Sequence, residues 1–306
     1  SAGGLYREAI EMAAWADRRR IGLVGFSEHH VTPEGFLPAP FPMAAAVAAR
    51  TRRVRISIAA LLVNLYDPIH LAEEIAVLDL LSQGRFSVTL GLGYREIEYR
   101  AFGIDWADRG RRLDGNLEIL LAALRGESFV RHGVEMALAP LPASPIPGLV
   151  TMGGNSVAAA RRAGRSGLVF CPALDDPELV AAYHEASRSA GNGEGVLVSP
   201  NSPATTLIDE DPDRAWAEVG AFLVHHAETY GAWAHPDRRA YAEAKGRSIE
   251  TLRDEGKYRI LTPEEAARAL RETGSLHLAP LTSGIDPRFG WKTLELFESR
   301  VEPLLA

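Results

Sequence analysis

The chain of 306 residues carries 33 basic and 40 acidic side chains, has a formal net charge of −7 and is 46% apolar. This composition is that of a soluble globular protein with one large domain or two small ones. No run of about 18 uncharged apolar residues is present to span a membrane. The acidic balance argues against nucleic acid or an anionic membrane as a partner. Because Cys171 is the only cysteine, an intrachain disulfide is excluded, and we expect a reducing, cytoplasmic compartment.

Helical periodicity and short apolar runs alternate along the chain. Apolar residues at helical spacing predict helices at residues 5–16, 41–50, 68–84, 113–124, 156–163, 178–189, after residue 212 and at 290–305. Short apolar runs bounded by glycine or polar residues predict strands at residues 22–27, 54–63, 85–91, 149–152, 167–171, 196–199 and 276–279. The segment 199–211 is expected to be a variable loop, and Thr262 with Glu265 has the spacing of a helix capping box.

This alternation predicts parallel strands with helices outside, because βα units place their crossover helices on the faces of a sheet. About 300 residues of such units fit a single α/β domain, a (β/α)₈ TIM barrel over residues 1–306, better than two doubly wound domains. The missing Gly-x-Gly-x-x-Gly motif after an early strand also argues against a dinucleotide fold. A barrel that opens on a helix lacks its first strand, so we expect the first β-strand to be absent from the numbered chain.

The first cluster of chemically active residues follows the strand at residues 22–27. Active sites of such barrels lie at the carboxyl ends of the strands, and Glu28, His29 and His30 occupy this end. A carboxylate beside two imidazoles can bind a polar ligand and move protons near neutral pH. Adjacent strand residues point to opposite faces, so a metal site is disfavoured. A purely structural hydrogen-bonding role for this cluster remains open.

Glycine-rich segments follow two further strands. Gly91 and Gly93 allow close approach of a flat ligand, although such glycines also occur in plain turns. Residues 152–156, Met-Gly-Gly-Asn-Ser, lead from a strand into a helix, where N–H donors and a hydroxyl form a phosphate site. Simple helix capping by Asn155 or Ser156 is the alternative. Cys171, at the end of another strand, is expected to line the pocket.

Taken together and in this order, the motifs resemble the bacterial luciferase-like monooxygenase family. The resemblance runs through Gly-Phe-Ser-Glu-His-His at 25–30 and the segments 49–55, 67–68, 71–74, 78–86, 91–93, 98–103, 152–156, 262–265 and 280–284. Members of this family are flavin- or deazaflavin-dependent (β/α)₈ barrels. Gly91 and Leu92 stand where the luciferases proper carry a Cys-Arg pair, so light emission is not expected.

The resemblance implies a set of cofactor-binding residues. It places the flavin phosphate at Gly153, Gly154, Asn155 and Ser156, and the ring against the strand at 54–63, with a non-proline cis peptide near Ile58 and Ala59. Glu28 matches the family's carboxylate beside the ring, and His29 is then the expected catalytic residue, which manages protons. The other cofactor-binding positions that we assign are Gly91, Asn64 and Tyr94.

The implied reaction is monooxygenation. Reduced FMN, delivered by a separate flavin reductase, reacts with O2, and one oxygen atom enters a small organic substrate while the other leaves as water. The family also contains enzymes that use the deazaflavin coenzyme F-420 for hydride transfer without O2 activation, and this is the alternative. A non-catalytic flavin-binding protein and a metal-dependent hydrolase are the other classes considered. The resemblance also favours a homodimer.

Overall fold

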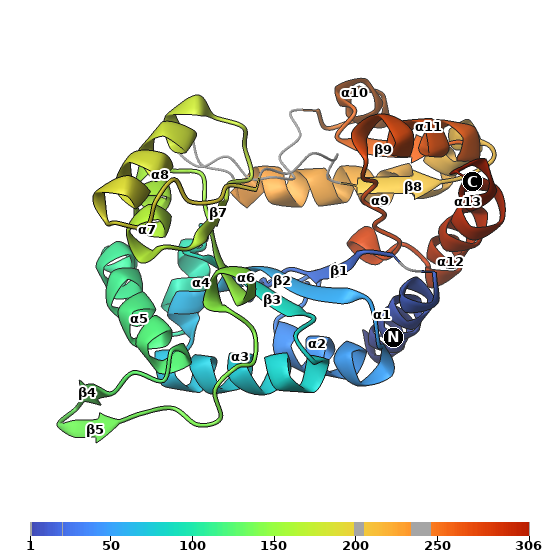
Figure 1. The fold of residues 1–306 in the computed structure, drawn as a ribbon. Helices are drawn as coiled ribbons and strands as arrows, with labels where there is room; N and C mark the ends of the chain where they lie inside the picture. The colour runs from blue at the N-terminus through green and yellow to red at the C-terminus, as the bar shows by residue number, and fades with distance from the viewer. Residues whose placement is uncertain (1, 20, 199–204, 234–245, 306) are drawn as a thin grey trace. The chain divides into compact units, whose positions relative to one another are not determined.

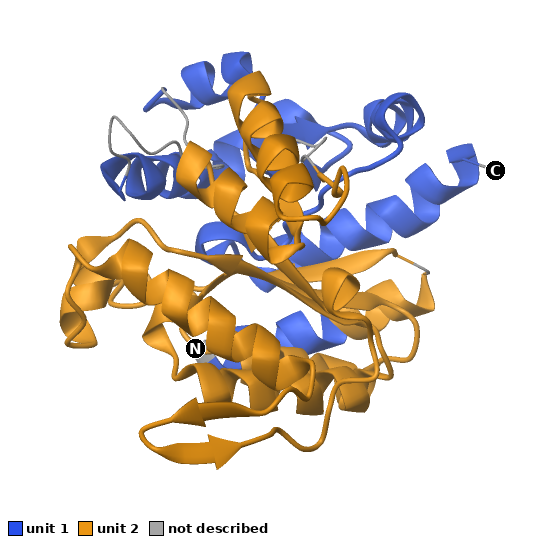
Figure 2. Ribbon diagram, turned by 60° about the vertical axis from the view of Figure 1, so that its left-hand side comes forward, with its two compact units in different colours: residues 1–12, 200–306 blue, residues 13–199 orange. Residues whose placement is uncertain are grey.

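The computed structural model describes residues 2–19, 21–198, 205–233 and 246–305. The chain divides into two compact units, residues 13–199 and residues 1–12 with 200–306 (Figure 2). The boundary near the N-terminus falls inside the first helix, α1, Ala2–Arg18. Each unit is therefore described by itself.

The unit of residues 13–199 is built on a parallel five-stranded sheet with the strand order β1-β2-β3-β6-β7 (Figure 1). Its strands are β1 Leu23–Phe26, β2 Arg55–Leu62, β3 Phe86–Gly91, β6 Val150–Gly153 and β7 Val169–Cys171. Parallel pairing brings the carboxyl ends of all five strands to one edge of the sheet. The sequence predicted each of these strands, and their pairing confirms the expected parallel α/β arrangement.

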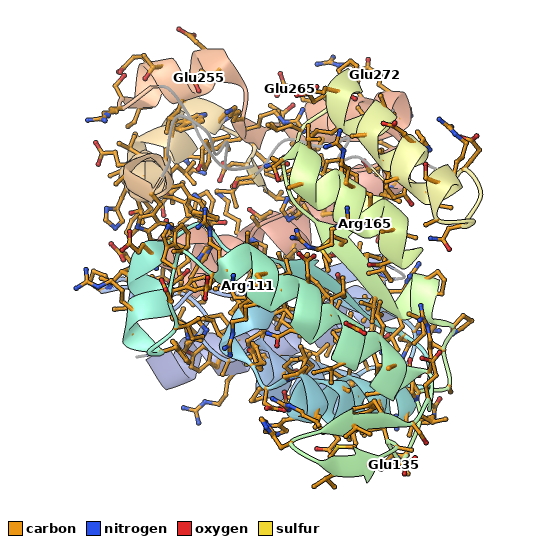
Figure 3. The ribbon with its side chains drawn as sticks, turned by 90° about the vertical axis from the view of Figure 1, so that its left-hand side faces the viewer. Arg111, Glu135, Arg165, Glu255, Glu265 and Glu272 are labelled. Carbon is orange, nitrogen blue, oxygen red and sulfur yellow. The ribbon has the colours of Figure 1, made fainter. Side chains whose placement is uncertain are left out.

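The helices of this unit are α2 Pro40–Arg50, α3 Pro68–Ser82, α4 Glu96–Ala101, α5 Arg109–Leu124, α6 Ile146–Leu149, α7 Val157–Ser166 and α8 Pro177–Ser189, with the short 3₁₀ helix η1 Val63–Leu65. Of these, α2, α3, α6 and α7 pack directly on strands of the sheet. Charged side chains such as Arg111 on α5 and Arg165 on α7 lie on the outer faces of these helices (Figure 3). A hairpin, β4 Phe129–Arg131 and β5 Val134–Met136, projects beyond α5 (Figure 1).

The two faces of the five-stranded sheet differ in chemistry. Ile56, Ile58, Val88 and Leu90 are fully buried, and these alternate positions face the covering helices. The positions between them carry small side chains, several of them hydroxyl-bearing and partly exposed, namely Ser57, Ala59, Ser87, Thr89, Thr151 and Cys171. This second face, which we call the open face, ends at the same carboxyl edge.

The second unit contains the parallel strands β8 Thr205–Ile208 and β9 Tyr258–Leu261. Its helices are α9 Pro212–Trp233, α10 Ile249–Glu255, α11 Pro263–Thr273, the 3₁₀ helix η2 Thr282–Gly284, α12 Pro287–Leu296, the π-helix η3 Phe297–Val301 and α13 Glu302–Leu305. Buried side chains of β8, β9, α9 and α10, with Phe289, form its core. The predicted capping box is confirmed, because Thr262 and Glu265 exchange side-chain and backbone hydrogen bonds at the start of α11.

The strand predictions for this part of the chain need correction. The segment 199–211 was expected to be a loop, but Thr205–Ile208 is strand β8, and β9 was not predicted. Of the predicted strand at 196–199, Leu197 makes a single bridge to Phe170, and Ser199 lies outside the described residues. The predicted strand at 276–279 makes a single bridge from Leu278 to Thr206. Pairing among the described strands yields separate sheets and does not close them into one ring. Among all the residues that the structure describes, no helix is both long and apolar enough to cross a membrane.

Candidate active site

Four of the predicted site segments meet at the carboxyl edge of the five-stranded sheet. The Glu28–His30 segment follows β1, Ala59 lies near the end of β2, Gly91 ends β3 and Gly153 ends β6. Neighbouring strands hold these ends in register, for example Leu62 opposite Gly91. The parallel sheet therefore gathers residues that are more than 120 positions apart in the chain.

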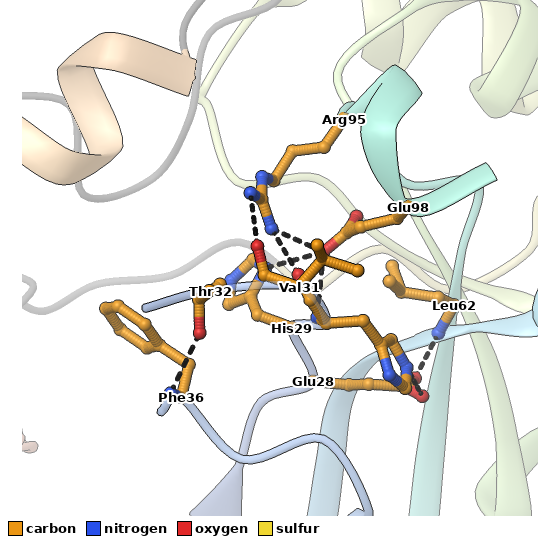
Figure 4. Close-up of polar contacts among 9 residues, drawn as sticks. Glu28, His29, Val31, Thr32, Phe36, Leu62, Arg95 and Glu98 are labelled. Atoms are coloured by element: carbon orange, nitrogen blue, oxygen red, sulfur yellow. Dashed lines mark hydrogen bonds and ion pairs between the residues drawn. The ribbon is translucent and has the colours of Figure 1, made fainter. Parts of the chain in front are cut away.

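Glu28 is 1% exposed and acts as a hydrogen-bond acceptor for three groups. Its Oε2 accepts from the N–H of Leu62 at 2.6 Å (Figure 4). Its Oε1 accepts from the Tyr66 hydroxyl at 2.6 Å. Nε2 of His30 lies 2.8 Å from the same Oε1. Because both oxygens are occupied, the structure gives Glu28 a positioning role, in which it ties the segment after β1 to the end of β2.

His29 is 6% exposed, and aromatic rings surround it. Its ring meets Phe36 and Tyr94 edge to face, with centroids 5.6 and 6.0 Å away. Nδ1 lies 3.6 Å from Oε1 of Glu98, and its backbone N–H donates to the Leu37 carbonyl at 3.1 Å. The imidazole is thus held in one orientation beside a carboxylate, which is the setting that a proton-transfer residue requires.

Two residues that follow β3, Arg95 and Glu98, hold His29 and His30 in place, and the sequence analysis assigned neither of them a role. Glu98, on α4, accepts hydrogen bonds from the His30 N–H at 3.0 Å and from Arg95 at 2.9 Å (Figure 4). Arg95 also donates to the His30 carbonyl at 2.6 Å. Burial acts to raise the pKa of Glu98, but the hydrogen bonds from His29 and His30 and the Arg95 charge hold it below its ordinary value. Glu98 therefore stays ionised beside the His29 ring.

A backbone irregularity marks the end of β2. The peptide bond between Ala59 and Ala60 is cis, and the register with β3 shifts between Ala59 and Leu61. The resemblance placed this bond near Ile58 and Ala59, so the structure moves it by one residue. Ile58 is fully buried, whereas Ala59 is exposed. A Cβ atom on Gly91 would lie 2.8 Å from the Cβ of Ala60, so only glycine fits beside this bulge.

Asn64 and Tyr94, both expected to line the cofactor pocket, differ in their surroundings. Asn64 is fully buried, and its amide nitrogen donates to Tyr99 at 3.1 Å and to the Arg109 carbonyl at 2.8 Å. Its amide oxygen accepts from Asn116 at 3.1 Å. The structure therefore makes Asn64 a brace between the end of β2 and α5. Tyr94 is partly exposed and lies against His29.

The turn between β6 and α7 has the features of a phosphate cradle. Gly154 has a φ of +138°, and a Cβ there would lie 2.7 Å from the Cβ of Ala159. Ser156 caps α7 by accepting from the Ala159 N–H at 3.2 Å, and Asn155 accepts from the Ala173 N–H at 2.8 Å. The capping alternative is thus present, and the first N–H groups of a helix still lack intrahelical partners. These side-chain-free glycines and this helix start fit an anionic phosphate.

Comparison with known proteins identifies the family. Residues 1–277 match the family model described as luciferase-like monooxygenase. This match covers most of the chain, and the chain belongs to the luciferase-like monooxygenase family. The resemblance drawn from the sequence motifs is confirmed.

Individual relatives and solved structures share the fold. The 4-hydroxyprotoasukamycin monooxygenase of Streptomyces nodosus subsp. asukaensis is 30% identical over 171 residues, 53% of this chain and 46% of that protein. The chain thus spans about half the length of such curated relatives. Monooxygenase RslO1 from Streptomyces bottropensis has a TM-score of 0.75 at 24% identity, over 100% of this chain and 95% of that one.

Two further solved structures represent the two cofactor types. The oxygenating constituent of 3,6-diketocamphane monooxygenase from Pseudomonas putida, in complex with FMN, has a TM-score of 0.69 at 21% identity and covers 99% of this chain and 94% of that one. An F-420-dependent secondary alcohol dehydrogenase has a TM-score of 0.67 at 17% identity and covers 98% and 95%. These likenesses confirm the fold class, an α/β fold of the luciferase-like TIM-barrel type.

Proposed function

We propose that this protein is a flavin-dependent monooxygenase that uses reduced FMN and O2 to oxygenate a small organic substrate. The observation that carries the proposal is the meeting, at one sheet edge, of His29, the Ala59–Ala60 bulge, Gly91 and the Gly153–Ser156 turn. Bound reduced FMN supplies the reaction with dioxygen that transfers one oxygen atom to the substrate, and the protein supplies binding and orientation.

The glycine positions account for cofactor binding. Gly153 and Gly154 bring bare backbone to the phosphate, and the start of α7 with Ser156 adds N–H donors and a hydroxyl. The exposed Ala59 beside the bulge offers the flat ring a surface without a large side chain. Because Gly91 leaves this surface open, a planar ligand can approach the strand ends closely.

His29 is the residue that we propose holds and moves a proton at the reacting centre. Its ring nitrogen Nδ1 lies 3.6 Å from Oε1 of the ionised Glu98, which orients the imidazole. Glu28 and Arg95 fix the backbone on either side of it, so the ring keeps its place during turnover. The rings of Phe36 and Tyr94, which contact His29, help to exclude water from the His29 imidazole.

A deazaflavin-dependent oxidoreductase is the second candidate. The likeness to the F-420-dependent alcohol dehydrogenase supports it, since the same fold serves both cofactors. We favour FMN because the named relative and the RslO1 and diketocamphane neighbours described above are monooxygenases. With FMN, we also propose that a separate reductase supplies the reduced cofactor.

Reconstitution with each reduced cofactor tests the proposal. The protein is mixed with FMN and a flavin reductase, or with reduced F-420, and with a panel of small organic ketones, terpenes and aromatic acids. We expect substrate-dependent O2 uptake, measured with an oxygen electrode, in the mixture with FMN and the reductase and not in the mixture with reduced F-420. Rapid substrate turnover with F-420 and no O2 uptake with FMN would overturn the monooxygenase proposal in favour of the second candidate.

A further inference from the structure

Three polar side chains cross the open face of the five-stranded sheet on neighbouring strands. Thr89 on β3 and Thr151 on β6 are register partners, and the Thr151 hydroxyl donates to Oγ1 of Thr89 at 2.8 Å. Cys171 on β7 lies beside Thr151, whose side chain interacts with the thiol. Polar side chains therefore adjoin one another across the sheet from β7 to β3.

The direction of the hydrogen bond between the two threonines is given by its geometry, in which the Thr151 hydroxyl donates and Thr89 Oγ1 accepts. The single hydroxyl proton of Thr151 is engaged by Thr89, with a longer approach of 3.5 Å to the Val88 carbonyl. Since Thr89 Oγ1 accepts this hydrogen bond, its own O–H points away from Thr151. Thr89 is partly exposed, so its O–H is available to a ligand over the open face.

Thr89 lies between the two segments that the cofactor needs. On one side its register partner is Ala59, next to the cis peptide bond. On the other side a Cβ on Gly153 would lie 3.0 Å from Cγ2 of Thr89, so the turn after β6 begins against this side chain. A ligand with its ring at Ala59 and its phosphate at Gly153 and Gly154 must pass over Thr89. In a flavin mononucleotide, the part between ring and phosphate is the ribityl chain, whose hydroxyl oxygens accept hydrogen bonds.

We propose that Thr89 is a cofactor-binding residue whose hydroxyl donates a hydrogen bond to an oxygen of the ribityl chain. Thr151 acts behind it as a positioning residue, because its hydroxyl donates to Thr89 Oγ1 and so leaves the Thr89 O–H to turn toward a ligand. This inference rests on the proposed function, since it takes the ligand to be a ribityl-bearing flavin.

The test compares Thr89→Val with Thr89→Ser. Valine keeps the shape and the strand preference of threonine but removes the hydroxyl, whereas serine keeps the hydroxyl. The probes are FMN, riboflavin and lumiflavin, the last of which has the ring without the ribityl chain, and Kd is measured by quenching of flavin fluorescence. We expect Thr89→Val to weaken FMN and riboflavin about tenfold, with lumiflavin unchanged, and Thr89→Ser to bind FMN within about threefold of the parent protein.

Two results would overturn the inference. One is an unchanged Kd for FMN and riboflavin in Thr89→Val; the other is an equal loss for lumiflavin, which would place the contact at the ring. If Thr89→Val fails to fold, as judged by circular dichroism, Thr151→Val serves in its place. That variant frees the Thr89 hydroxyl to rotate and should weaken FMN about twofold to threefold without affecting lumiflavin. Failure of the parent protein to bind any of the three flavins would instead overturn the proposed function, and the inference with it.

Discussion

At the scale of single residues, Glu28 and His29 have different duties although they are adjacent. Both carboxylate oxygens of Glu28 form hydrogen bonds within the protein, to Leu62, Tyr66 and His30. His29 is held by its backbone and by rings, and its imidazole is the group that can carry a proton. The proposed proton transfer therefore depends on His29, and the position of the segment that carries His29 depends on Glu28.

Replacing His29 by asparagine tests this division. We expect His29→Asn to lower kcat by about 10²–10⁴-fold, the usual contribution of a general acid or base, while the Kd for FMN stays within about threefold. The measurement is steady-state O2 uptake with a substrate that supports turnover, together with fluorescence titration of FMN. His70→Asn, at an exposed histidine on α3, is the matched control. Unchanged kcat in His29→Asn would show that the imidazole is not the proton carrier.

Gly154 tests the phosphate cradle. A side chain at this position meets Ala159 at 2.7 Å and is strained at a φ of +138°, so Gly154→Ala must displace the start of α7. We expect FMN to bind at least about tenfold more weakly, because a charge-assisted phosphate contact contributes about 1.5–3 kcal/mol. Gly110→Ala, which meets open space on α5, is the control and should leave the Kd unchanged. Equal affinities of the two variants would remove the phosphate from this turn.

At the scale of elements, helix α4 holds the segment after β1 in place. Glu98 and Arg95 reach from the start of α4 to the backbone of His30 and Val31. Both side chains are buried, and their contacts bridge about 65 residues of sequence. The geometry of the proton-transfer residue is thus set by an element outside its own loop.

This brace predicts a pH dependence of stability. The pKa of Glu98 in the folded protein lies below its ordinary value, so its contribution is present above the unfolded pKa of about 4.3 and is lost as pH falls through the folded pKa. In urea unfolding at pH 7, the free energy of unfolding of Glu98→Gln should be about 1–3 kcal/mol lower than that of the parent protein. On acidification below about pH 4.3, the variant should lose less stability than the parent, because it has no carboxylate to protonate at this position. Glu96→Gln, at an exposed position on the same helix, should follow the parent curve. If the free energy of unfolding of the parent and of Glu98→Gln fell equally with decreasing pH, the lowered pKa of Glu98 would be contradicted.

The elements also explain how far the sequence could predict the structure. The strands of the five-stranded sheet and the turn at Gly153 are marked by local apolar runs and glycines, and they were predicted. Strand β8, Thr205–Ile208, directly follows a stretch rich in serine and proline, so the segment was interpreted as a loop. The braces at Glu98 and Asn64 depend on contacts between distant segments, which periodicity and local motifs do not encode.

At the scale of the whole molecule, helix α3 carries a cluster of exposed apolar side chains. Its buried face carries Leu71 and Ile75, yet Val77, Leu80 and Leu81 are 52%, 41% and 49% exposed. A surface helix normally has a polar outer face, and clustered exposed apolar residues mark interaction sites. We propose that this face, Val77 with Leu80 and Leu81, forms the interface of the expected homodimer.

Sedimentation velocity tests the homodimer. We expect the parent protein to sediment as a dimer and Leu81→Glu to sediment as a folded monomer, because a buried unpaired charge is costly at an interface. Leu305→Glu, at an exposed C-terminal position, is the control and should remain dimeric. A monomeric parent protein, or a dimeric Leu81→Glu, would contradict this interface.

Transfer of oxygen from ¹⁸O₂ measures the central claim most directly. The protein is supplied with enzymatically reduced FMN, ¹⁸O₂ and a substrate that supports O2 uptake, and the organic product is analysed by mass spectrometry. The proposed monooxygenase incorporates one ¹⁸O atom into each product molecule, with the second appearing in water. Product that contains no ¹⁸O, formed at the same rate with reduced F-420 under anaerobic conditions, would contradict it.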